Sequence, residues 1–396
     1  MKDFSGEVQG PTSGLHSRSY TDTDTHTVFM FDRRLIMNFD WPTLLTAGLI
    51  SALGVVNIYS STYPHSGTAT PLYLKQIYWL VLGFGILLLT LACDYRTFLR
   101  YGYPFYIFCL SLLVLVMVLG RTTSGSQRWL PLGIISFQPS ELAKIGLILV
   151  MARFFTEKEL AQGYGLRDLA IPFLLLGLPA LLVFKQPDLG TVVLMGFIFL
   201  SILVFTGVQP RAWLTLGAAC AVAAPILWFL LKDYQKTRLR VFLDPELDPL
   251  KTGYHITQSK IAVGSGGFWG KGFLKGTQSQ LHFLPEQHTD FVFSVWAEEW
   301  GFVGSFVLLF LLLFLVSRGL KIASSSKDRG GEVLAIGVSA LIFWQAFVNI
   351  GMVVGLVPVV GVPLPLFSYG GTSVITTLIG IGILMNVSMR RFMLNR

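Results

Sequence analysis

Ten apolar segments constrain the fold of this chain more than any other feature, because each is close to the roughly 20 residues that an α-helix needs to cross a bilayer. Of the 396 residues, 53% are hydrophobic and only 13% are charged, which is more apolar surface than a globular core requires. We therefore predict an all-α polytopic membrane protein with about ten transmembrane helices. The expected spans cover residues 44–60, 76–93, 103–120, 140–155, 169–185, 189–207, 212–231, 291–316, 333–354 and 371–389.

Basic residues in the short connections predict the orientation of these helices. Arginines and lysines gather in alternate connections, and Arg33–Arg34 and Arg390–Arg391 flank the first and last spans on that same side. Because short loops rich in Arg and Lys stay in the cytoplasm, we expect both termini to be cytoplasmic. The extracytoplasmic side then carries residues 121–139 and a large loop between spans seven and eight, residues 232–290. Long loops are translocated despite their positive charge, so the cations of these two loops do not contradict the orientation.

Residues 1–40 differ from the rest of the chain. They are rich in Ser, Thr, Gly and Asp, which predicts a disordered cytoplasmic tail before a transmembrane domain over residues 41–392. Cys93, Cys109 and Cys220 lie in or beside apolar runs, without disulfide or zinc spacing, so we expect them to pack. The formal net charge of +8 forms no basic stripe interleaved with aromatics, and we expect no nucleic-acid binding.

Asp290 lies where the large outer loop meets the eighth apolar run, near the end of the sequence Leu-Pro-Glu-Gln-His-Thr-Asp-Phe. A carboxylate at a membrane edge is costly to desolvate and therefore indicates a functional site. The alternative is an interfacial helix cap, in which Thr289 or Asp290 accepts hydrogen bonds from the first free amides of the following helix. The residues alone leave both interpretations open.

Other site chemistry has little support in the sequence. It contains no HExxH motif and no nucleophile elbow, and the spacing of His282, Glu286 and His288 matches no zinc site. No cofactor is required by these residues. The one that remains compatible is a divalent cation, Mg²⁺ or Mn²⁺, held between Asp290 and a substrate pyrophosphate, since Mg²⁺ commonly combines one or two carboxylates with phosphate oxygens.

Polar residues also interrupt the apolar runs at helix starts. Glu141 and Lys144 are three residues apart, so they share a helix face and can neutralise each other. They form either an ion pair that orients the fourth span or a catalytic pair, and both interpretations remain open. Asp188 follows Pro187 at the start of another span, where helix capping competes with a functional role.

Further polar residues occur in the last three spans. Glu298 and Glu299 lie two turns beyond Asp290, where at least one should face a partner or a watery cavity. Gln345 and Asn349 are four residues apart and are expected to join helices rather than touch a substrate. The proline-rich stretch 358–373 is unsuited to a continuous helix and must be buried in protein or line a cavity.

Cations concentrate on the expected outer face. Arg128, Lys271 and Lys275 are among them, and together with the embedded carboxylates they suggest an anionic, lipid-linked substrate, because Arg makes forked contacts with phosphate. The alternative for each is contact with anionic lipid headgroups. The glycine-rich stretch 264–272 either brings backbone amides close to a phosphate or is a flexible outer loop with interfacial aromatics.

These motifs together resemble the SEDS family (shape, elongation, division and sporulation) over essentially all of residues 40–392. Within the family, residues 253–260 and 275–280 are more similar to the rod-shape-determining members than to the division members. The resemblance rests on Arg128–Trp129, residues 138–144, 186–191, 264–272 and 283–291, Ala297–Glu299 and the proline-rich stretch.

The resemblance implies a peptidoglycan glycosyltransferase that polymerises lipid II during cell elongation, on the outer face of the bacterial cytoplasmic (inner) membrane. Asp290 matches the family's essential aspartate and would act as general base, with inversion at the sugar and undecaprenyl pyrophosphate as leaving group. Glu141 and Lys144 match an ion pair near the substrate cavity, and Asp188 matches a further motif position. The expected supporting or substrate-binding residues are Glu141, Lys144, Arg128, Asp188, Lys271, Lys275, His288 and Glu298.

The implied partners are lipid II, membrane lipids, a class B penicillin-binding protein that supplies the transpeptidase, and other proteins of the elongation complex. Two other functions fit many spans with embedded carboxylates. One is a flippase for the lipid-linked precursor, and the other is a non-enzymatic scaffold of the elongation complex.

Overall fold

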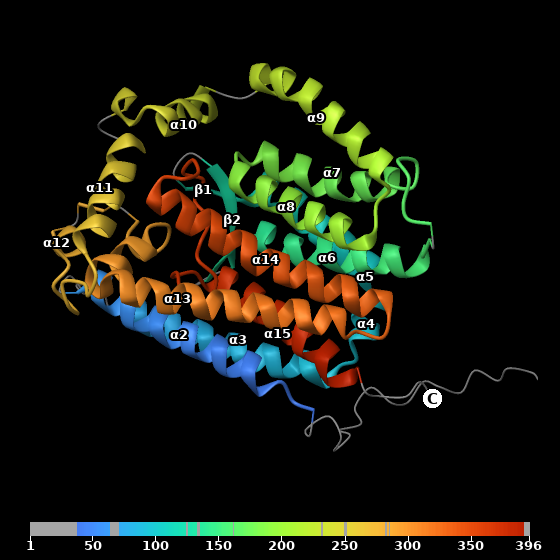
Figure 1. The fold of residues 1–396 in the computed structure, drawn as a ribbon, viewed down its shortest axis with the longest axis horizontal. Helices are drawn as coiled ribbons and strands as arrows, with labels where there is room; N and C mark the ends of the chain where they lie inside the picture. Colours follow the sequence, from blue (N-terminus) through green and yellow to red (C-terminus); the bar gives the residue numbers. More distant parts are fainter. Residues whose placement is uncertain are drawn as a thin grey trace, which may run out of the picture.

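The computed structural model describes residues 38–63, 71–123, 126–132, 135–160, 162–230, 233–248, 252–281, 283–284 and 286–391. The expected disordered tail, residues 1–40, lies almost wholly outside these residues. Helices dominate the described part, and they pack into an elongated bundle (Figure 1).

Each of the ten expected spans corresponds to a long helix. Seven of them, among the described residues, are long and apolar enough to cross a membrane, whereas α7 is shorter and α6 and α9 do not qualify. Ten crossings therefore remain a prediction. The ten helices are α2 (Trp41–Thr62), α3 (Leu72–Ala92), α5 (Gly102–Leu119), α6 (Pro139–Glu157), α7 (Ala170–Lys185), α8 (Leu189–Thr206), α9 (Pro210–Leu230), α13 (Val292–Ser324), α14 (Arg329–Val354) and α15 (Gly371–Arg390).

The interior is built around α14 and α15, most of whose residues are buried. Helix α14 packs against α13, α6 and α8, while α15 packs against α3 (Figure 1). Glycines allow these close approaches, since a side chain at Gly337 would collide with Ile148 of α6. Cys109 is buried as expected, but Cys220 on α9 is exposed, so the packing role predicted for it was wrong.

The prediction of an all-α fold was wrong for residues 121–137. This connection forms an antiparallel sheet in the order β1 (Arg121–Thr123), β2 (Ser126–Leu132) and β3 (Ile135–Phe137). The stretch is too polar and too rich in turn residues for a span, and pairing its strands satisfies backbone groups that lie beside the membrane helices. The short helix α4 (Tyr95–Arg100) joins α3 to α5.

The large segment 232–290 is not a simple loop. It contains α10 (Asp233–Leu243), the 3₁₀ helix η1 (Pro245–Leu247), α11 (Thr252–Ser265) and α12 (Thr277–Gln280), which gather at one end of the bundle (Figure 1). Helix α11 is anchored by Ser259, whose Oγ donates to the Val353 carbonyl at 2.7 Å and lies 2.8 Å from Ser294 Oγ. These contacts fix the segment to α13 and α14 at the end where Asp290 lies.

Candidate functional site

Asp290 lies in the tight turn that precedes α13. The Glu286 carbonyl accepts hydrogen bonds from the amides of Thr289, Asp290 and Phe291 at 3.1, 3.2 and 3.3 Å. Phe291 is the N-cap residue of α13, and no side chain makes a capping hydrogen bond there. The helix-cap interpretation of Asp290 was therefore wrong, and its carboxylate is not committed to starting the helix.

The proline-rich stretch between α14 and α15 folds over this turn. Ser368 Oγ donates to the Thr289 carbonyl at 2.7 Å, and the Tyr369 amide donates to the His288 carbonyl at 2.9 Å. Gly361 has a φ of +69°, and a Cβ there would lie 3.2 Å from Asp290 Oδ2. Residues 358–370 of the stretch are non-helical and largely buried, as expected, whereas its last three residues begin α15; the stretch forms one wall beside the carboxylate.

Asn349 ties this wall to Asp290. Its Nδ2 donates to the Asp290 carbonyl at 3.0 Å and to the Val362 carbonyl at 2.7 Å. The expected role of Asn349 in joining elements is therefore confirmed. Through Asn349, α14 therefore fixes the position of Asp290 relative to the proline-rich stretch.

Burial, together with nearby charges, moves the pKa of the Asp290 carboxyl group toward neutral pH. Burial raises its pKa to about 6, and the negative charge of Glu286 acts in the same direction. Arg238 and Arg128 lower the pKa, whereas Asp188 raises it. Asp290 is nevertheless partly exposed, so a substrate can reach it. A carboxylate of this kind holds a proton well enough to act as a base and releases it again near neutral pH.

The two arginines approach from different elements. Arg238 on α10 donates from Nη1 to the Val359 carbonyl of the proline-rich stretch at 3.3 Å. Arg128 on β2 donates to the carbonyls of Gln186 and Pro187, and its Nη1 lies 3.6 Å from Asp188 Oδ1. Both guanidinium groups are thus held by backbone carbonyls at the same end of the bundle as Asp290.

Asp188 has the capping role that competed with function in its sequence context. Its Oδ1 accepts from the Thr191 amide at 3.3 Å and its Oδ2 from Thr191 Oγ1 at 2.9 Å, at the start of α8. Gln138 Nε2 also reaches Asp188 Oδ2, at 3.4 Å. Asp188 therefore links the starts of α6 and α8 with Arg128, and its carboxylate is largely occupied by protein donors.

Glu141 and Lys144 form the predicted pair. Lys144 Nζ lies 2.7 Å from Glu141 Oε1, and both side chains are almost fully enclosed. The pair lies in the first turns of α6, close in sequence to Gln138 and hence near Asp188. The pair therefore lies in the protein interior next to the site.

Lys271 and Glu298 form a second cluster instead of joining Asp290. Glu298 Oε1 accepts from Lys271 Nζ at 2.7 Å, from Thr277 Oγ1 at 3.0 Å and from the Gln278 amide at 3.0 Å. Glu298 thus faces partners, as expected. Lys275 is exposed, and neither lysine is among the charges that dominate the pKa of Asp290.

His288 is half-buried next to the site. Its ring packs edge-on against Tyr369, with centroids 5.9 Å apart, and burial lowers the pKa of its imidazole. His288 is therefore neutral at pH 7, which suits packing and neutral hydrogen bonding better than a charge contact with phosphate.

The glycine-rich stretch is explained by protein contacts. Helix α13 is kinked at Gly301 (φ 63°, ψ −157°), and the Lys271 and Gly272 amides donate to the carbonyls of Glu298 and Glu299, each at 3.0 Å. The Phe302 amide donates back to the Gly267 carbonyl at 2.9 Å. These amides replace the bonds that the helix loses at its kink, so they are not directed at a phosphate.

Sequence reasoning missed the role of Arg238. It was one of many loop cations, and its contact with the Val359 carbonyl, which needs the folded structure, is what distinguishes it from Arg240 on the same helix. Gly361 was also missed as a site residue, since its close approach to Asp290 depends on tertiary structure. Among the described residues, no three His, Cys, Asp or Glu side chains cluster to hold a metal.

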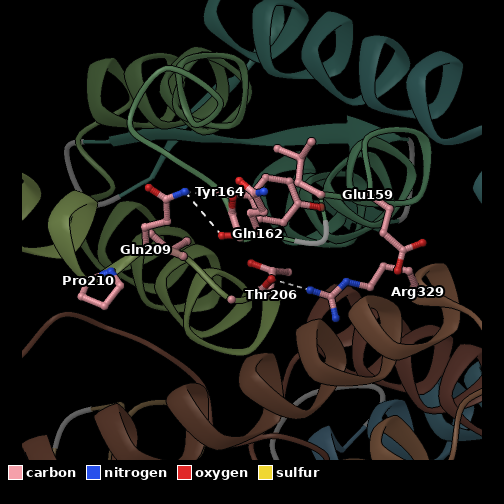
Figure 2. Close-up of a pocket in the computed structure, with 11 residues that line it drawn as sticks. Glu159, Gln162, Tyr164, Thr206, Gln209, Pro210 and Arg329 are labelled. Atoms are coloured by element: carbon pink, nitrogen blue, oxygen red, sulfur yellow. Dashed lines mark hydrogen bonds between the residues drawn. The ribbon is translucent and has the colours of Figure 1, made fainter.

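A separate cavity of about 710 Å³ lies at the opposite end of α6, α8 and α14 (Figure 2). Arg329 at the start of α14 donates to the Thr206 carbonyl at the end of α8. Tyr164 and Val208 pair as an isolated parallel bridge in the same wall. The cavity lies among the connections that follow α6 and α8, beside the start of α14, and it is remote from Asp290.

Comparisons with known proteins identify the family of this chain. Residues 40–392 match the family model FTSW_RODA_SPOVE, described as "Cell cycle protein". Peptidoglycan glycosyltransferase MrdB of Escherichia coli K12 is 47% identical over 326 residues, covering 81% of this chain and 87% of MrdB. Peptidoglycan glycosyltransferase RodA of Treponema pallidum is 33% identical, covering 90% and 99% of the two chains.

Two solved structures share the fold. The crystal structure of the rod-shape-determining protein RodA of Thermus thermophilus matches with a TM-score of 0.67 at 31% identity, covering 90% of this chain and 98% of that one. A chain of a peptidoglycan synthase complex, from a study of polymerisation and crosslinking, matches with a TM-score of 0.77 at 35% identity, covering 89% and 98%. The protein therefore belongs to the SEDS family of FtsW, RodA and SpoVE, a family of multi-pass membrane proteins whose members named above are peptidoglycan glycosyltransferases.

Proposed function

We propose that this protein polymerises lipid II into glycan strands during cell elongation, with Asp290 as the general base. The observation that carries the proposal is the state of the Asp290 carboxylate. It caps no helix, remains partly exposed and has a pKa raised to about 6. The named relatives supply the reaction class, since MrdB and RodA are peptidoglycan glycosyltransferases.

The chemistry needs one displacement. The 4-hydroxyl of the acceptor GlcNAc gives its proton to Asp290 while its oxygen attacks C1 of the donor MurNAc. The bond between C1 and the pyrophosphate oxygen breaks, and undecaprenyl pyrophosphate leaves with the electron pair. Attack from the face opposite the leaving group converts the α linkage to a β linkage, so a single base suffices and no covalent intermediate is needed.

Arg128 and Arg238 are suited to the negative charge that grows on the leaving pyrophosphate. Both are fixed by backbone carbonyls, and a preorganised cation stabilises developing charge without further rearrangement. Lys271 is less suited, because Glu298 engages its ammonium group. If a divalent cation takes part, Asp290 would hold it rather than Asp188, which is engaged by Thr191 and Arg128, and the cation would supply additional charge neutralisation.

The topology that suits this reaction places the Asp290 end of the bundle outside the bacterial cytoplasmic membrane and both termini in the cytoplasm. Lipid II is then reached from the outer leaflet. A class B penicillin-binding protein is the expected transpeptidase partner, which the match to a chain of a synthase complex supports. Other elongation-complex proteins remain expected partners.

The test is polymerisation of lipid II by the purified full-length chain, alone and with its transpeptidase partner. Asp290→Asn should reduce the rate by about 10² to 10⁴-fold, the usual contribution of a general base. Glu246→Gln, an exposed carboxylate in the same outer segment, is the matched control and should polymerise normally. Normal polymer from Asp290→Asn would exclude the general-base role. Translocation without polymer would indicate a flippase, and neither activity would indicate a scaffold.

A further inference from the structure

Three buried side chains in the interior carry polar atoms that have no partner among the described residues. Ser140 Oγ, Glu141 Oε2 and both amide atoms of Gln345 are enclosed without a hydrogen bond to any described group. The three residues are only 2%, 3% and 1% exposed. Leaving such atoms unpaired in an apolar interior is costly, and native structures contain few of them.

Packing contacts of nearby residues show that the three helices carrying or flanking these side chains meet at one junction. Helices α6 and α15 run side by side in the same direction, because the Gln138 amide bonds Thr372 Oγ1 at their starts. Seven or eight residues later, a Cβ at Gly380 would lie 3.6 Å from Ile145 Cδ1 and 3.2 Å from Val338 Cγ1. Helix α14 therefore meets both others at this level, running in the opposite direction.

Helical spacing then brings Glu141 and Gln345 together. Glu141 is one turn from Ile145 on the same face of α6, and Gln345 is two turns from Val338 on the same face of α14. At 1.5 Å per residue, they lie about 6 and 10 Å from the junction, both toward the Asp290 end. Side chains tilt toward the N-terminus of their own helix, so on these antiparallel helices the two lean toward each other.

We propose that Ser140, Glu141 and Gln345 hold an internal water site, of one or two molecules, at the junction of α6, α14 and α15. The orphan atoms comprise both donors and acceptors, which matches water. A metal ion fits poorly, because the amide hydrogens of Gln345 would face it. No extra positive charge is needed either, since Lys144 already pairs with Glu141 Oε1 at 2.7 Å.

This water would complete the solvation of a buried ion pair. One oxygen of Glu141 is bonded by Lys144, and the other faces the junction without a protein donor. A buried pair remains charged only when its remaining hydrogen-bonding capacity is satisfied. Gln345 would thus position the Glu141–Lys144 pair through water, and it would tie α14 to α6. The inference concerns the folded protein and does not depend on the proposed reaction.

The sign of one stability change tests it. If Gln345 is an orphan, Gln345→Met removes a buried polar group and should raise the Tm of the full-length chain in detergent. If Gln345 binds water shared with Glu141, the same change should lower the Tm by roughly 1–2 °C, the shift expected in a chain of this length from about one lost hydrogen bond. Leu341→Met, one turn away on α14 and equally buried, controls for the flexible Met side chain and should change Tm less.

If Gln345→Met folds poorly, two further measurements test the proposed water site. Gln345→Met combined with Glu141→Gln should show non-additive Tm changes, since both alter the same water. A structure of the unaltered protein at a resolution that shows ordered water should place density within hydrogen-bonding distance of Glu141 Oε2 and Gln345. A raised Tm, additive changes or a dry junction would each overturn the proposal.

Discussion

Asp290 differs from Asp188 and Glu298 because, among the described residues, no hydrogen bond to its side chain is found. Asp188 caps α8, and Glu298 binds Lys271 and the amides of α12. The backbone of Asp290 is held by Glu286 and Asn349. A reactive carboxylate must be positioned without being neutralised, and backbone anchoring achieves both.

The pKa of Asp290 predicts an acid limb in the pH profile of polymerisation. A base must be deprotonated, so activity should rise as pH increases through about 6. The positive charge of Arg238 lowers this pKa, so Arg238→Gln should move the acid limb toward higher pH. Arg240→Gln, on the same helix but exposed, is the control and should leave the limb in place. An unchanged acid limb in Arg238→Gln would show that Arg238 does not lower the pKa of Asp290.

At the scale of elements, hydropathy predicted the long helices well, because an apolar run of that length has few other stable conformations. It did not predict β1–β3 or the helices of residues 232–290. Those elements are stabilised by tertiary contacts, such as Ser259 on α11 with Val353 on α14, and not by their own periodicity. The kink at Gly301 could not be predicted either, since the residues whose hydrogen bonds stabilise it lie some thirty positions earlier in the chain.

Glu298 is predicted to hold the outer segment against the kinked part of α13. Glu298→Gln removes a charge that accepts from Lys271 and from the Gln278 and Ser279 amides. Hydrogen bonds to a charged group contribute roughly 1.5–3 kcal/mol, so exchange of those two amides should accelerate about tenfold or more. Hydrogen–deuterium exchange measures this directly. Glu332→Gln, which breaks an ion pair at the opposite end, should leave these amides unchanged; equal protection in Glu298→Gln would contradict the clamp.

At the scale of the whole molecule, the site joins residues that are far apart in the chain, from β2, α10, the turn before α13, α14 and the proline-rich stretch. Asp290 and the Glu141–Lys144 pair could be singled out from the sequence, because a charge inside an apolar run is conspicuous. Arg238 and Gly361 could not, because neither stands out from its neighbours in the sequence. Their position at the site depends on the packing of α10 and the proline-rich stretch near Asp290. Individual reactive residues can therefore be predicted from the sequence, whereas the set of residues that meets at the site depends on tertiary packing.

The same packing predicts that two ion pairs of equal length on α6 differ in their contribution to stability. Lys144–Glu141 and Arg153–Glu157 both span 2.7 Å, but the first is enclosed and the second is substantially exposed. Glu141→Ala or Lys144→Ala alone leaves a buried charge unpaired and should cost about 3–5 kcal/mol, whereas the double variant should cost clearly less than the sum. The exposed pair should show a coupling of about 0–1 kcal/mol.

Thermal unfolding of the six variants in one detergent gives both couplings. The Arg153–Glu157 pair serves as the internal control, because it shares the helix and the 2.7 Å distance with Lys144–Glu141 but is exposed. Additive effects at Glu141 and Lys144 would mean that each charge finds another partner when its own is removed. In that case the interior of the bundle is wet enough to solvate a lone charge, and the low dielectric that makes the buried pair a unit would be absent.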